Sequence, residues 1–154
     1  MVPRRHFCLL VLSATLAGCT NPAPPPLAEP PLYPNETPRL RGQINKWADH
    51  YEVPRTLVHR LALRESSHRP LARNGPYWGV LQILPETART MGFRGEPAEL
   101  LDPDTNLEFA VKYLRGAWLL SGGDQTAAIG WYARGYYYEA KRRGMLVETG
   151  LRPN

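Results

Sequence analysis

Half of the 16 prolines in this 154-residue chain fall within one short stretch, and this clustering limits where a packed core can begin. The stretch runs from Thr20 to Pro38 and contains Pro22, Pro24, Pro25, Pro26, Pro30, Pro31, Pro34 and Pro38. Proline fixes φ and lacks a backbone N–H, so such a segment favours an extended conformation, reaching on the order of 50–60 Å at about 3.1 Å per residue. We therefore predict a stiff linker over residues 19–38, one folded domain over residues 39–146 and a tail over residues 147–154.

The first 18 residues have the features of a secretory signal peptide. A basic pair, Arg4-Arg5, precedes an apolar run from Phe7 to Leu12, and small residues then lead to Gly18-Cys19. About a dozen apolar residues are too few to span a bilayer comfortably. The pattern predicts removal of residues 1–18, and an uncleaved membrane anchor is the alternative.

The residues Leu16-Ala17-Gly18-Cys19 resemble the lipobox of bacterial lipoproteins. That resemblance implies cleavage before Cys19 and acylation of its thiol, and two or three acyl chains make a stable anchor at roughly 0.8 kcal/mol per buried CH₂. Because Cys8 would leave with the signal peptide, no cysteine would remain for a disulfide, a metal or a nucleophile. Thr20 at the next position implies, by similarity to lipoproteins that lack an aspartate there, an outer-membrane anchor with the domain facing the periplasm.

The chain carries a mild positive charge, +5 over the whole sequence. Removal of residues 1–18 would leave 17 basic and 14 acidic side chains, or about +3. This balance suits an anionic polymer such as the cell wall and does not indicate a nucleic-acid partner, and solvated surface charge is the simpler explanation.

Apolar residues recur at helical spacing through the remainder of the chain, with no clear alternation of period two. We expect helices that begin at Thr37-Pro38, at Pro54 and at Pro85, a long helix from about Asp104 to Leu120, and a further helix capped by Asp124. Asp102 and Asp104 are interpreted as caps of the long helix. The predicted fold class is all-α, or mostly so, in a compact domain of about 110 residues.

Glu65 is the residue most indicative of chemistry. It follows Leu57 and Leu61 at intervals of four, so it shares their helix face and lies where that face is about to end. A carboxyl group in apolar surroundings is harder to ionise, and a protonated glutamic acid is what glycosidic cleavage requires. The alternative is an exposed Glu65 paired with one of three arginines: Arg60, Arg64 or Arg69.

Three motifs then occur in order: Glu65-Ser66-Ser67, the segment GVLQILPETA at residues 79–88, and the segment GWYARG at residues 130–135. Together they resemble the soluble lytic transglycosylase (SLT) domain of glycoside hydrolase family 23, which is related to goose-type lysozymes. The resemblance runs from about Ile44 to Gly144 and implies a lysozyme-like helical domain.

Carried over by position, the resemblance makes Glu65 the catalytic acid. It implies substrate-binding roles for Ser66, Asn74, Gln82 and Tyr132, with the Tyr132 hydroxyl facing the carboxylate. Three of them have a simpler alternative: Ser66 as a helix-terminal hydroxyl, Gln82 as a helix cap and Tyr132 as core. Asn74 lies in a loop whose length and sequence differ from the commonest family pattern. The chain departs from the family pattern at Leu81, where methionine is usual, and at Ala133, where the family's asparagine is lost.

The resemblance also implies a peptidoglycan lytic transglycosylase that needs no cofactor and no second carboxylate. Glu65 would protonate the β-1,4 oxygen between N-acetylmuramic acid (MurNAc) and N-acetylglucosamine (GlcNAc), and a 1,6-anhydro-MurNAc end would form. The alternatives are a hydrolytic muramidase and a catalytically silent peptidoglycan-binding lipoprotein. In either case aromatic residues could stack on sugars: Tyr77, Trp78, Tyr136, Tyr137 and Tyr138. We expect a monomer without a metal site, because His50, His59 and His68 lack ligand-like spacing.

Overall fold

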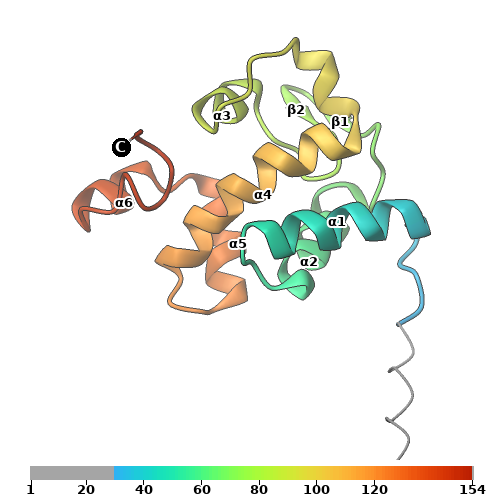
Figure 1. Ribbon diagram of the computed structural model, residues 1–154, viewed down its shortest axis with the longest axis horizontal. Helices are drawn as coiled ribbons and strands as arrows, with labels where there is room; N and C mark the ends of the chain where they lie inside the picture. Colours follow the sequence, from blue (N-terminus) through green and yellow to red (C-terminus); the bar gives the residue numbers. More distant parts are fainter. Residues whose placement is uncertain (1–29, 154) are drawn as a thin grey trace, which may run out of the picture. The chain divides into compact units, whose positions relative to one another are not determined.

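The computed structural model describes residues 30–153, and in them it shows a mostly helical domain (Figure 1). The α-helices are α1 (Pro38–His50), α2 (Arg55–Ser66), α3 (Pro85–Thr90), α4 (Pro103–Leu120), α5 (Gln125–Arg134) and α6 (Tyr137–Arg142). A short antiparallel hairpin of β1 (Arg73–Asn74) and β2 (Tyr77–Trp78) follows α2, and a 3-10 helix (Pro97–Leu101) precedes α4. The predicted fold class is confirmed.

Helix α4 is the centre of the domain, and it packs against α1, α3 and α5. Figure 1 shows α1 below α4, with the hairpin and α3 above it. The buried face of α4 carries Leu107, Ala110, Leu114 and Ala117, each fully inaccessible to solvent. This face holds the remaining helices in one core.

Side-chain caps start three of the helices where the sequence predicts them. Thr37 accepts a hydrogen bond from the backbone N–H of Leu40 at 3.1 Å, and Asp102 and Asp124 accept the corresponding bonds for α4 and α5. Each satisfies an N–H that the first turn leaves without a partner. Asp104 was also predicted to cap α4, but its side chain has a different role.

Asp104 joins α4 to α1. Its carboxylate accepts hydrogen bonds from the Trp47 indole at 2.8 Å and from the Lys46 ammonium group at 3.1 Å. These bonds lower the pKa of Asp104 although its partial burial acts in the opposite direction. The ion pair with Lys46 is exposed, so the indole contact carries more of the specificity of the packing.

The folded unit extends further at both ends than the predicted boundaries. It begins at Pro31 rather than residue 39, because Tyr33 stacks on His68 and the side chain of Glu36 is fully buried. Residues 147–153 are also part of it, since Thr149 is buried and donates a hydrogen bond to the carbonyl of Met145. The predicted signal peptide and the lipidation site Cys19 lie outside the described residues.

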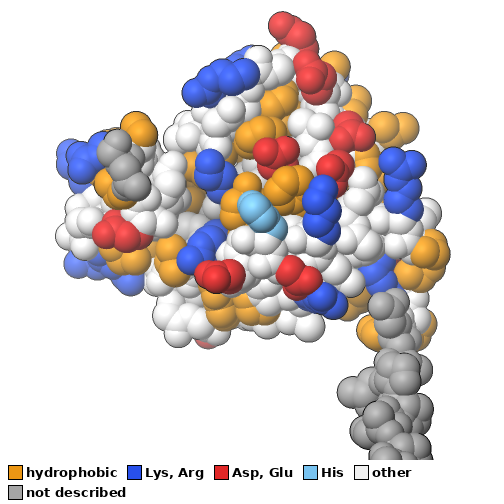
Figure 2. All heavy atoms as spheres, in the orientation of Figure 1, with side chains coloured by type: hydrophobic (Ala, Val, Ile, Leu, Met, Phe, Trp, Pro, Cys, Tyr) orange, Lys and Arg blue, Asp and Glu red, His pale blue; other side chains and the backbone are white. Residues whose placement is uncertain are grey.

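The two-residue strands, the 3-10 helix and α6 were not expected from the sequence. Strands of two residues are too short to show an alternating pattern, and α6 is only six residues long. Figure 2 shows basic and acidic side chains interspersed over the face that α1 and α4 present. No helix within residues 30–153 has both the length and the apolar character needed to cross a membrane.

Candidate active site

Glu65 lies in the last turn of α2, on the face that Leu57 and Leu61 bury completely. Its side chain is 22% exposed to solvent, so the carboxyl group lies at the border between core and solvent. Burial raises the pKa of Glu65, and the positive charge of Arg64 opposes that rise less strongly. The structure therefore agrees with the expectation of a half-buried carboxyl group that is harder to ionise.

Of the three arginines considered as partners, Arg64 forms the contact with Glu65. Its Nε lies 3.6 Å from Glu65 Oε1, and about half of the Arg64 side chain is exposed. Arg60 instead donates hydrogen bonds to Gln125 and Thr126 on α5. An ion pair this long and this exposed is weak, so it leaves the carboxyl group available for chemistry.

A cleft of about 460 Å³ opens beside Glu65. It is lined by residues from α2, the hairpin, the loop before α3, and helices α4 and α5. Of the predicted site residues, it brings Asn74, Gln82 and Tyr132 together with Glu65. Segments up to 70 residues apart in the sequence thus converge on one carboxyl group.

Gln82 holds the loop that forms one wall of the cleft. Its φ of +49° places it in the left-handed region, and its amide Nε2 donates hydrogen bonds to the carbonyls of Ala72 at 3.0 Å and Gly79 at 2.8 Å. These bonds tie together the two residues that flank the hairpin, Ala72 before β1 and Gly79 after β2. Helix α3 begins with Leu84 as its N-cap, so Gln82 does not cap that helix. Its buried Oε1 has no hydrogen-bond partner among the described residues.

Tyr132 lies on α5 with only 8% of its surface exposed. Its hydroxyl donates a 2.8 Å hydrogen bond to the carbonyl of Leu81, and Tyr132 lines the same cleft as the Glu65 carboxyl group that the family resemblance implies it faces. Burial, followed by the negative charge of Glu65, raises the pKa of Tyr132 well above its usual value. The hydroxyl therefore stays protonated and fastens α5 to the cleft wall.

Ser66 and Asn74 occupy different environments. Ser66 is buried, and its hydroxyl donates a 2.7 Å hydrogen bond to the carbonyl of Val80 while accepting one from the N–H of Arg69. It does not line the cleft, so its position agrees with the alternative of a structural hydroxyl. Asn74, in the exposed strand β1, does line the cleft.

Asn106 is a supporting residue that the sequence analysis missed. It is fully buried on α4, accepts a hydrogen bond from the N–H of Leu81 and donates to the carbonyls of Trp78 and Leu100. Its side chain lies so close to Gly79 that a Cβ at that glycine would overlap it. A polar residue at the helical spacing of the buried α4 face was the available signal.

The cleft also contains residues that the motifs did not indicate. Tyr113 on α4 contacts the Tyr132 ring edge-on at 5.3 Å, and burial raises the pKa of Tyr113 to about 12. Arg134 lines the cleft from α5 with its guanidinium 3.8 Å from the Trp131 ring centre. Together with Arg64, it gives the cleft two positive charges.

Among the aromatic residues suggested as sugar platforms, only one contributes to the cleft wall formed by the described residues. That residue is Tyr77 in β2. Trp78 stacks under the guanidinium of Arg73, and Tyr136 is 1% exposed, which excludes it as a platform. Tyr138, at 83% exposure, lies on α6 away from the cleft lining.

His59 and His68 are a pair, which corrects the expectation that the histidines lack ligand-like pairing. His59 Nδ1 lies 3.4 Å from His68 Nε2, and both side chains adjoin Glu36. The pairing arises because Ser67 and His68 both adopt positive φ and turn the chain back beside α2. The two histidines are nine residues apart in the sequence, and this separation gave no indication of the turn.

The comparisons agree with this geometry. Residues 42–144, more than half of the chain, match the model of the transglycosylase SLT domain. Neither the comparison with curated proteins nor that with solved structures found a match. The matched range includes the whole cleft with Glu65, and the chain therefore belongs to the SLT domain family, whose members are lytic transglycosylases acting on peptidoglycan.

Proposed function

We propose that this protein cleaves the β-1,4 bond between MurNAc and GlcNAc and leaves a 1,6-anhydro-MurNAc end. Membership of the SLT family indicates lytic transglycosylase-type activity on peptidoglycan. The observation that supports the finer proposal is the composition of the cleft. Among the described residues that line it, Glu65 is the one acidic side chain.

A single carboxyl group in the cleft favours a reaction in which the same residue acts twice. Glu65 donates its proton to the glycosidic oxygen as the bond to MurNAc C1 breaks, and the burial that raises its pKa favours the protonated form that this step needs. The neighbouring 2-acetamido group of the sugar stabilises the positive charge at C1. Glu65, now a carboxylate, then takes the proton of the MurNAc 6-hydroxyl. The oxygen of that hydroxyl bonds to C1 and closes the anhydro ring.

The other polar groups of the cleft suit substrate positioning. Gln82 Oε1 is a buried acceptor that a sugar hydroxyl or amide N–H could satisfy, and satisfaction of such an atom favours a correctly placed ligand. Holding the 6-hydroxyl close to C1 in place of water converts ring closure into an efficient intramolecular step. Arg64 and Arg134 provide positive charge for carboxylates of the polymer.

Muropeptide mass spectrometry of digested sacculi tests the proposal. We expect soluble fragments that end in 1,6-anhydro-MurNAc. A muramidase would use water instead and would need a second carboxylate on the opposite face of the sugar. Reducing MurNAc ends as the main product would contradict the anhydro reaction and support hydrolysis.

The pH dependence provides a second test, centred on Arg64. Glu65 acts as an acid only while protonated, so activity should fall as pH rises through its pKa. Because the charge of Arg64 lowers the pKa of Glu65, Arg64→Ala should raise that pKa and shift the alkaline limb of the kcat/KM profile to higher pH. Steady-state rates on soluble glycan fragments over a pH series measure the shift.

Arg60→Ala is the matched control for this shift. Arg60 lies one turn earlier on α2 and contacts α5 rather than Glu65, so its removal should leave the alkaline limb in place. A limb that stays fixed in Arg64→Ala, or moves to lower pH, would show that the limb does not report Glu65.

We further propose that the mature protein is a lipoprotein of the bacterial envelope, anchored through acylated Cys19, facing the periplasm and more consistent with the outer than the inner membrane. The lipobox-like residues before Cys19 support the anchor. The glycan strands of the wall are its proposed partner, and we propose that the protein acts as a monomer.

A further inference from the structure

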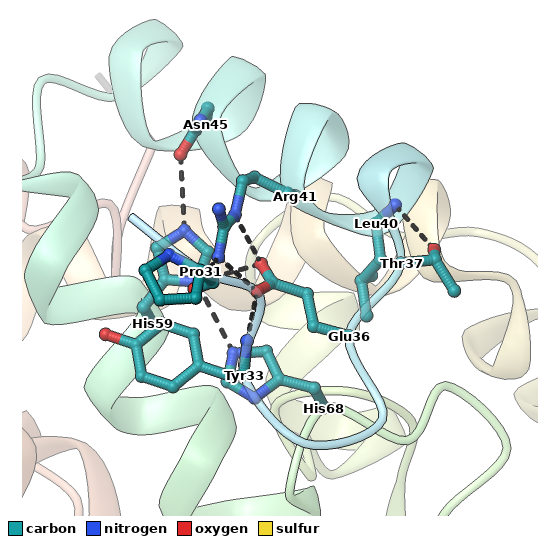
Figure 3. Close-up of polar contacts among 9 residues, drawn as sticks. All are labelled: Pro31, Tyr33, Glu36, Thr37, Leu40, Arg41, Asn45, His59 and His68. Atoms are coloured by element: carbon teal, nitrogen blue, oxygen red, sulfur yellow. Dashed lines mark hydrogen bonds and ion pairs between the residues drawn. The ribbon is translucent and has the colours of Figure 1, made fainter. Parts of the chain in front are cut away.

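A buried cluster of three potential metal ligands lies outside the cleft. Glu36 comes from the segment before α1, His59 from the middle of α2, and His68 from the turn after α2 (Figure 3). The side chain of Glu36 is fully buried, and His59 and His68 are 8% and 0% exposed. The proposed reaction uses none of the three.

The spacing of their ligand atoms fits a zinc ion. His59 Nδ1 lies 3.4 Å from His68 Nε2 and 3.5 Å from Glu36 Oε1, and all three atoms lie within 4.8 Å of one another. Nitrogen and oxygen ligands bind Zn²⁺ at about 2.0–2.2 Å, which places tetrahedral neighbours about 3.3–3.5 Å apart. Two of the three separations already have this value.

The hydrogen bonds of His59 orient its free lone pair toward the cluster. Its Nε2 lies 3.3 Å from Asn45 Oδ1, and because an amide oxygen can only accept, this contact is a hydrogen bond when the ring proton is on Nε2. Nδ1 then presents a lone pair to the carboxylate of Glu36 at 3.5 Å. A metal-bound histidine that donates its other N–H to an oxygen acceptor is the usual second layer of a zinc site.

Two acceptor atoms, His59 Nδ1 and Glu36 Oε1, face each other in the core, and this arrangement favours a cation between them. Neutral imidazoles are the form that binds zinc.

Arg41 and Tyr33 hold the third ligand in place. Glu36 Oε2 accepts hydrogen bonds from Arg41 Nη2 at 2.6 Å and from the N–H of Tyr33 at 2.8 Å, whereas Oε1 accepts from Arg41 Nε at 3.1 Å. Oε1 is the atom next to His59, and a carboxylate oxygen has a second lone pair for a metal. The charge of Arg41 should make the site weaker than four-ligand structural sites.

We propose that Glu36, His59 and His68 bind one Zn²⁺ ion, with a water molecule as the fourth ligand. The ion would fasten the segment before α1 to the middle of α2 and to the turn that follows Glu65. Its role is structural, and the inference does not depend on the proposed reaction.

The test uses the full-length chain, freed of metal by chelation and titrated with Zn²⁺ and Co²⁺. We expect one equivalent of zinc to bind by calorimetry, a melting temperature that rises with zinc concentration, and a visible cobalt spectrum of tetrahedral type. No binding, or cobalt bound only with an octahedral spectrum, would overturn the proposal.

Variants locate the site. His59→Gln and His68→Gln should each weaken zinc binding at least about 100-fold, and Asn45→Ala, which removes the acceptor behind His59, should weaken it about 10- to 100-fold. His50→Ala is the matched control, since His50 is an exposed histidine on α1. If a glutamine variant does not fold, Asn45→Ala still decides, because Asn45 is only partly buried. Binding equal to wild type in Asn45→Ala and the folded glutamine variants would show that zinc binds elsewhere.

Discussion

Glu65→Gln should lower kcat for release of soluble muropeptides on the order of 10²–10⁴-fold, the usual contribution of a general acid and base. Glutamine has the same size and still fits the 22% exposed position at the end of α2, but its amide cannot donate a proton to the glycosidic oxygen. We expect the free energy of unfolding to change by less than about 1 kcal/mol, because the carboxylate forms only a long, exposed ion pair. Chromatography of digested sacculi and thermal unfolding measure the two effects.

Glu86→Gln provides the control for this loss. Glu86 lies in the first turn of α3, and 77% of its side chain is exposed, so its substitution should leave activity unchanged. Wild-type activity in Glu65→Gln would remove Glu65 from the reaction. If the wild-type protein also released no muropeptides, the chain would be a silent peptidoglycan-binding protein.

Gly79→Ala should destabilise the domain by about 2–5 kcal/mol and reduce activity with it. Gly79 has a φ of +73°, and a Cβ there would overlap the Asn106 side chain and the carbonyl of Leu100. The positive φ alone costs about 1–2 kcal/mol for an alanine, and overpacking against a buried side chain and a backbone atom adds about 1–3 kcal/mol. Denaturant unfolding measures the loss.

Gly75→Ala separates the two contributions. Gly75 lies in the turn between β1 and β2 with a φ of +56°, but a Cβ there would meet no atom within 4 Å. It should therefore show only the conformational cost, about 1–2 kcal/mol. Equal losses in the two variants would mean that Asn106 does not support the loop at Gly79.

The helices and the position of Glu65 could be predicted because local rules determine them. Thr37 and Asp124 are caps with short-range geometry, and Leu57, Leu61 and Glu65 share one helix face by spacing alone. The SLT family was predicted from three ordered motifs and is confirmed.

What could not be predicted depends on contacts between distant segments. Asn106 reaches Leu81 across 25 residues, and Tyr113 enters the cleft only because α4 packs against α5. Positive φ at non-glycine residues such as Gln82 and His68 has no strong sequence signal. The prolines before α1 favour extended backbone but do not exclude packing, so Pro31 begins the folded unit.

Two side chains of the cleft are held by hydrogen bonds to peptide carbonyls, and this has a consequence for divergence. Tyr132 is held by the carbonyl of Leu81, and Gln82 by those of Ala72 and Gly79. Every residue type supplies the same carbonyl, so exchange of leucine for methionine at position 81 leaves the anchor for Tyr132 unchanged. The hydrogen bonds to the main chain that shape the cleft around Glu65 can therefore persist while the residues that supply those carbonyls change in sequence.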